Sequence, residues 1–181
     1  MTMGDILAAA DRIRPHVHRT PVVTCSMIDR IAGCSIVFKC ENLQKVGAFK
    51  ARGATNAVLL LDHVAAARGV ATHSSGNHAA ALARAASLRG IPSFIVMPRT
   101  APAPKRAAVE AYGARITPCE PTLAARESTL AEVVARTGAT FVHPYDDERV
   151  IAGQGTAALE LLAQSPGLDV DRKSTRLNSS H

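Results

Sequence analysis

A length of 181 residues with 47% hydrophobic content is enough to bury a core, in one domain or two small ones. No run of about 18 apolar residues occurs and the N-terminus lacks a signal-peptide pattern, so we expect a cytoplasmic protein with no membrane partner. The formal net charge is +6, but the basic residues are scattered, aromatic residues make up only 3% and Trp is absent, which argues against nucleic-acid binding.

The first part of the chain mixes short predicted elements. Periodic apolar residues predict helices over residues 6–14 and 26–31, with Ser26 as the cap of the second. Residues 35–40 form an apolar run that predicts a strand. Residues 51–67 have the composition of one long helix.

From residue 70 onward, strand and helix patterns alternate. The predicted strands cover residues 70–72, 93–97, 114–117 and 140–142. The predicted helices cover residues 77–88, 104–111 and 122–137. This alternation predicts an α/β fold with a parallel sheet and flanking helices. Ligands of such sheets bind at the carboxyl ends of the strands, which is where residues 74–78 fall.

Lys50 lies among small and apolar neighbours, in the run Gly-Ala-Phe-Lys-Ala-Arg-Gly at residues 47–53. A partly desolvated lysine has a lowered pKa, and its neutral amine can form a Schiff base with an aldehyde. Lys50 is therefore a candidate covalent anchor. The alternative is that Lys50 and Arg52 form a solvated pair at the start of a helix.

A second candidate site is the turn made by Ser74, Ser75, Gly76, Asn77 and His78, between a predicted strand and a predicted helix. Such a turn presents backbone N–H groups to an anion. The alternative is ordinary capping, in which a Ser or Asn side chain satisfies the amides of the first helical turn.

Three segments in the order 41–54, 74–79 and 150–156 carry a resemblance to a known family. Over about residues 21–162 the chain resembles the threonine dehydratase and serine racemase group of fold-type II pyridoxal phosphate enzymes. The resemblance implies a tryptophan synthase beta-like architecture, truncated here, and pyridoxal 5'-phosphate as the cofactor. It also implies a small amino-acid substrate and, for the full-length protein, a homodimer.

The same resemblance implies a role for each candidate residue. Lys50 would hold the cofactor covalently and move a proton at the substrate α-carbon, and Phe49 would pack near the cofactor ring. Asn77 would donate a hydrogen bond to the phenolic oxygen of the ring. The substrate carboxylate would be bound by the amides and hydroxyls of Ser74, Ser75, Gly76, Asn77 and His78.

Two features favour different reactions within this group. Ser75 is typical of racemases, where a serine can act as acid or base opposite the lysine, whereas Tyr145 after Pro144 is typical of dehydratases. We favour conversion of L-threonine or L-serine to a 2-oxo acid and ammonia, because elimination needs one base and a leaving hydroxyl while racemization needs two opposed groups. Serine racemase activity is the alternative.

The resemblance also implies domain boundaries. Residues 1–69 would begin a large cofactor-binding domain, residues 70–145 would form a small α/β domain, and residues 146–168 would start the second part of the large domain. Residues 169–181 lose apolar periodicity and resemble a translated cloning sequence or a disordered tail.

Members of the group continue past this sequence, with a glycine-rich loop for the cofactor phosphate and a polar residue facing the pyridine nitrogen. Neither has a counterpart here. The third hypothesis is therefore a non-catalytic fragment or binding module, whose exposed surface would favour self-association.

The cysteines and histidines give no sign of a metal site. Cys25, Cys34, Cys40 and Cys119 show no Cys-x-x-Cys spacing, which predicts free thiols. We assign no metal role to the histidines, which include His16, His18, His63, His73 and His143.

Overall fold

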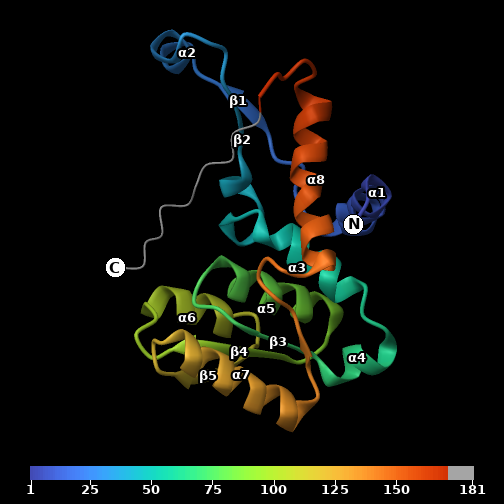
Figure 1. The fold of residues 1–181 in the computed structure, drawn as a ribbon, viewed down its shortest axis with the longest axis vertical. Helices are drawn as coiled ribbons and strands as arrows, with labels where there is room; N and C mark the ends of the chain where they lie inside the picture. Colours follow the sequence, from blue (N-terminus) through green and yellow to red (C-terminus); the bar gives the residue numbers. More distant parts are fainter. Residues whose placement is uncertain (171–181) are drawn as a thin grey trace.

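The computed structural model describes residues 1–170, and its centre is a parallel sheet of four strands in the order β5-β4-β3-β6 (Figure 1). The strands are Val70–His73 (β3), Ser93–Pro98 (β4), Arg115–Cys119 (β5) and Thr140–Phe141 (β6). In the register, Val70 lies opposite Ser93 on one side and Thr140 on the other. The prediction of a parallel sheet with flanking helices is confirmed. The predicted tail at residues 169–181 lies, beyond residue 170, outside the described part.

Helices cover both faces of this sheet, which explains why its strands read as apolar runs. Helices α5 (Asn77–Arg89) and α6 (Ala103–Glu110) pack on one face, and α7 (Leu123–Thr137) packs on the other. Val70 and Ile95 belong to the core under α5, whereas Ala71 and Phe94 belong to the core under α7. Successive side chains along each strand therefore point to opposite faces of the sheet and belong to two separate cores.

The other elements lie on the α5 side of the sheet, except the short helix at residues 63–68, which lies beside the sheet (Figure 1). They are helices α1 (Met3–Ile13), α2 (Ser26–Ala32), α3 (Lys50–Leu59), α4 (His63–Arg68) and α8 (Glu148–Gln164), and the antiparallel strands β1 (Val22–Thr24) and β2 (Val37–Lys39). Helix α3 packs on α5, and α8 packs on α3. The boundaries of the two predicted domains stay a prediction.

Two local predictions were wrong in detail, and one short strand was not predicted. Residues 51–67 form two helices rather than one, because the side chain of Asp62 accepts a hydrogen bond from Ala65 N and starts α4 anew. Ser26 is the first residue of α2, and Cys25 occupies the cap position. Strand β1 was missed, since a three-residue strand owes its existence to pairing with β2 rather than to its own pattern.

Helices α3 and α8 touch backbone to backbone at two glycines. A Cβ atom at Gly153 would lie 2.6 Å from the Cα atom of Gly53, and a Cβ atom at Gly53 would lie 2.6 Å from the carbonyl oxygen of Val150. Real Cβ contacts are essentially never this short, so both positions need glycine. The segment at residues 150–156 therefore has a packing role, which fixes α3 against α8.

We predict that Gly153→Ala destabilises the chain by about 1–3 kcal/mol, because the new methyl group overpacks the helix crossing. Gly4→Ala is the matched control, since its Cβ would lie 3.5 Å from the Thr2 hydroxyl, an ordinary contact, and alanine favours a helix. Urea unfolding of the two variants measures the difference. Equal stability of both would contradict the close crossing.

The expectations about cysteines, membrane-spanning helices and metal sites can be compared with the structure of residues 1–170. All four cysteines are free thiols, as predicted. No helix in this part of the chain has both the length and the apolar composition that crossing a bilayer requires. Nor are three His, Cys, Asp or Glu side chains in it grouped so that they could hold a metal ion.

Candidate active site

The chain enters α3 through a tight turn that sets the position of Lys50. Val46 has φ 56° and Gly47 has φ 66°, so two successive residues adopt the left-handed conformation. This conformation is unusual for a β-branched residue. The buried side chain of Gln44 braces the turn, because its Oε1 accepts hydrogen bonds from His18 N at 2.8 Å and Lys45 N at 2.9 Å. Lys50 then begins the helix.

The half-buried side chain of Lys50 extends to the segment that follows β6. Its Nζ donates a hydrogen bond to the carbonyl oxygen of Pro144 at 2.6 Å, and it lies 5.2 Å from the centroid of the Phe49 ring. Pro144 was not predicted as a partner of Lys50. The contact brings the amine to the carboxyl-end edge of the sheet.

The alternative of a solvated Lys50–Arg52 pair is wrong, because Arg52 is 0% exposed. Its Nε and Nη2 donate to the two carboxylate oxygens of Glu41 at 2.8 and 2.7 Å, and its Nη1 donates to Glu160 at 2.8 Å. The side chain of Lys39 in turn donates to Glu160 at 2.7 Å. Burial opposes the charge on Arg52, but the hydrogen bonds to both carboxylates outweigh it and raise its pKa. Sequence reasoning missed this network.

The turn at residues 74–78 joins β3 to α5. Ser74 Oγ accepts a hydrogen bond from Gly76 N at 3.3 Å, while Gly76 occupies the cap position of α5. No side chain within residues 1–170 caps this helix, so the ordinary-capping alternative is wrong. A Cβ atom at Gly76 would meet no atom within 4 Å. The first amides of α5 are therefore available to an anion.

Ser75 and Asn77 are half-buried in this turn. Neither side chain makes a hydrogen bond to another residue of the described chain, 1–170. Both residues thus have polar groups available to a ligand, and their predicted roles stay predictions.

His78 connects the turn with the segment after β6. Its Nε2 lies 3.2 Å from the carbonyl oxygen of Val142, which can only accept, so Nε2 carries the proton. Its Nδ1 is buried and has no partner within residues 1–170. Burial lowers the pKa of His78 to about 4; the bond to Val142 opposes this shift, and the nearby charge of Lys50 adds to it. His78 is therefore neutral at pH 7.

This shift gives a pH prediction. Between pH 6.5 and 4 the unfolded chain binds the proton of His78 and the folded chain does not, so stability falls as the pH falls through this window. We expect His78 to account for about 2 kcal/mol of the loss between pH 7 and 5. Urea unfolding at both pH values should show a smaller loss in His78→Gln than in the parent chain. Burial also lowers the pKa of His73, which contributes to the loss of stability in both proteins. An equal loss in the two proteins would contradict the assignment of this pH dependence to His78.

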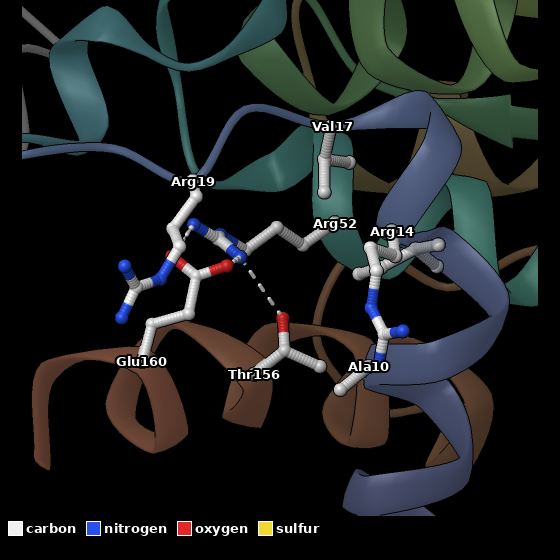
Figure 2. A pocket seen from close by; sticks show the side chains of 8 residues that line it. Ala10, Arg14, Val17, Arg19, Arg52, Thr156 and Glu160 are labelled. Carbon is white, nitrogen blue, oxygen red and sulfur yellow. Dashed lines mark hydrogen bonds and ion pairs between the residues drawn. The ribbon is translucent and has the colours of Figure 1, made fainter. Parts of the chain in front are cut away.

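A cavity of about 230 Å³ lies beside the Arg52 network, where α1 approaches α3 and α8. Figure 2 shows Arg52 directed at Thr156 and Glu160 of α8. None of the predicted site residues lines this cavity. A second cavity, of about 320 Å³, is lined in part by His73 and His143, which lie next to the candidate site in sequence.

The fold and the site together define an α/β protein that presents the Lys50 amine and the uncapped turn at residues 74–78 at the carboxyl end of its sheet. Residues 13–172 match the family model described as pyridoxal-phosphate dependent enzyme, so the chain belongs to this family. The architecture is that of fold-type II pyridoxal phosphate enzymes, over the part that the chain covers.

The chain is similar in sequence and in structure to several characterised members of this family. The chain is 59% identical to beta-hydroxyaspartate dehydratase from Paracoccus denitrificans (strain Pd 1222), over 93% of the chain and 53% of that protein. It superimposes on maize serine racemase with a TM-score of 0.91 at 49% identity, covering 92% of this chain and 51% of that one. For threonine deaminase isoform 2 from Solanum lycopersicum the TM-score is 0.82 at 32% identity, covering 91% of this chain and 47% of that one. The chain thus spans about half the length of the curated relatives it matches.

Proposed function

We propose that this chain provides the catalytic lysine and the carboxylate-binding turn of a pyridoxal phosphate-dependent ammonia-lyase. The reaction is conversion of a β-hydroxy amino acid to a 2-oxo acid and ammonia. The observation that carries the proposal is the position of Lys50 Nζ at the sheet edge, 2.6 Å from the Pro144 carbonyl, in a member of this family.

The donor set of the described residues fits part of pyridoxal phosphate. Lys50 offers an amine for the aldehyde, Phe49 offers a ring surface beside that amine, and Asn77 offers an amide with no hydrogen-bond partner within residues 1–170. When bound, the cofactor supplies an electron sink for the α-carbon of the substrate. A partner for its phosphate group is not part of this donor set.

The residues of the chain would divide the remaining work. The uncapped turn at residues 74–78 would bind the substrate carboxylate through its backbone amides and so orient the α-carbon. Lys50 Nζ would take the α-proton, and the Pro144 carbonyl would hold this amine in place. Loss of the β-hydroxyl as water and later hydrolysis of the imine then give the 2-oxo acid and ammonia.

Three substrates suit a direct comparison. L-serine and L-threonine have the carboxylate and the β-hydroxyl that this arrangement requires. 3-Hydroxyaspartate has both groups and a second carboxylate, and the 59% identity to beta-hydroxyaspartate dehydratase supports its inclusion. We propose dehydration of this class of amino acids and leave the choice among the three to the assay.

The test uses the full-length form of the protein loaded with pyridoxal phosphate. We expect release of a 2-oxo acid and ammonia from at least one of the three substrates, and a loss of at least about 100-fold in Lys50→Ala, which lacks the base. Lys105→Ala, on the exposed face of α6, is the control and should keep the parent rate. If none of the three substrates released ammonia, the proposal would be wrong.

Trapping separates cofactor attachment from catalysis. The 181-residue chain is incubated with pyridoxal phosphate, reduced with borohydride and digested, and an adduct on the Lys50 peptide is expected. Its absence in this chain, together with its presence in the full-length form, would favour the third hypothesis, a non-catalytic fragment.

Racemization of serine is a second candidate, supported by Ser75 and by the likeness to maize serine racemase. Ser75 is half-buried on the turn that would bind the carboxylate, so its hydroxyl is available as a second acid or base.

We predict that Ser75→Ala lowers any racemization by about 100-fold and leaves elimination within a few-fold, because only racemization needs the second group. Chiral chromatography of serine and the ammonia assay measure the two reactions in one sample. A parallel loss of both reactions would argue against a separate role for Ser75.

A further inference from the structure

Four aromatic rings connect the two loops of the candidate site. His73, the last residue of β3, stacks on Phe141 of β6 with ring centroids 5.9 Å apart. Phe141 contacts His143 at 5.6 Å, and His143 contacts Tyr145 edge to face at 4.4 Å. The end of β3 leads directly into the turn at residues 74–78, so this stack joins that turn to the segment after β6.

His143 also organises the backbone of its own segment. Its Nδ1 accepts hydrogen bonds from the backbone N–H groups of Asp146 at 2.7 Å and Tyr145 at 3.3 Å. The bonds close a tight turn around Pro144, whose ring already fixes one backbone dihedral angle. The direction of the Pro144 carbonyl is therefore set by this turn.

The carbonyl of Pro144 is the group that accepts the hydrogen bond from Lys50 Nζ at 2.6 Å. We propose that His143 is a positioning residue, which fixes the Lys50 amine by holding the turn that presents the Pro144 carbonyl. His143 acts here through the backbone rather than by contact with the amine. Its importance for catalysis rests on the proposed function, but its control of Lys50 can be measured without a cofactor.

Two substitutions separate the two contributions of the His143 side chain. His143→Asn keeps an acceptor that suits such a turn and removes the ring from the stack. His143→Phe keeps a ring between Phe141 and Tyr145 and removes the acceptor. The proposal gives the decisive role to the acceptor, so the two variants should behave differently.

The readout is the rate of acetylation at Lys50 in the 181-residue chain, measured by competitive labelling and mass spectrometry. A carbonyl acceptor favours the charged ammonium, whereas acetylation requires the neutral amine. We expect labelling of Lys50 to rise about five- to tenfold in His143→Phe and to match the parent chain in His143→Asn. Lys45 and Lys105, quantified in the same digest, serve as internal controls and should not change.

Other patterns overturn the proposal. Unchanged labelling of Lys50 in the Phe variant would show that the acceptor does not position the amine. A rise in the Asn variant alone would give the role to ring packing. A rise at every lysine in both variants would show general loss of structure.

A measurement on the parent chain covers the case in which the Phe variant does not fold. The amide of Asp146 should exchange slowly with solvent although the residue is exposed, because it donates to His143 Nδ1. Exchange at the rate of an unprotected amide would overturn the proposal.

In the loaded full-length enzyme, His143→Phe should lower kcat about tenfold with a smaller change in KM, since the carboxylate turn is retained. A failure of the proposed lyase activity would leave the labelling result at Lys50 intact, so the two failures are distinguishable.

Discussion

The buried guanidinium of Arg52 is the interaction on which the position of the candidate site depends. A charge without solvent is costly unless it is paired and fully hydrogen-bonded. Arg52 meets this condition, because it forms ion pairs with Glu41 and Glu160. Lys39 forms a further ion pair with Glu160. Glu41 precedes α3, whereas Glu160 lies in α8, 108 residues further along the chain than Arg52. The charges are therefore satisfied only when α8 is docked on α3 in one register.

The glycine contact between α3 and α8 acts on the same register. Gly53 follows Arg52 directly, and Gly153 lies one helical turn before Thr156, which accepts a hydrogen bond from Arg52. A close crossing and a buried ionic group thus lie side by side, and each would be lost if one helix slid along the other. Lys50 is one turn away on α3, so this rigid joint carries the amine to the sheet edge. The position of the amine therefore depends on the contacts between α3 and α8 as well as on its own hydrogen bond to Pro144.

Features of the fold and the site that depend on residues close in sequence could be predicted, whereas contacts between residues far apart in sequence could not. The parallel sheet follows from local patterns, because each strand is a short apolar run beside a helical stretch. Lys50 and the turn at residues 74–78 could be singled out because their residue types carry chemistry and their segments resemble a known family. The bond from Lys50 to Pro144 joins residues 94 positions apart and uses a backbone carbonyl, which leaves no signature in the side-chain pattern. The burial of Arg52 was missed for the same reason, since Glu160 is distant in sequence.

The Arg52 network and the candidate site differ in how their polar groups are satisfied. In this network, which has no predicted ligand, Arg52, Lys39, Glu41 and Glu160 each face an opposite charge and make several hydrogen bonds. At the sheet edge, His78 Nδ1 is buried without a partner within the described chain, and α5 begins without a side-chain cap. Buried polar atoms without a partner in the described residues also occur in α3 and α8, at Thr55 Oγ1 and Gln154 Nε2, so one such atom does not by itself mark a site. At the sheet edge the unsatisfied groups lie together on one turn, where a single ligand would provide the missing hydrogen bonds.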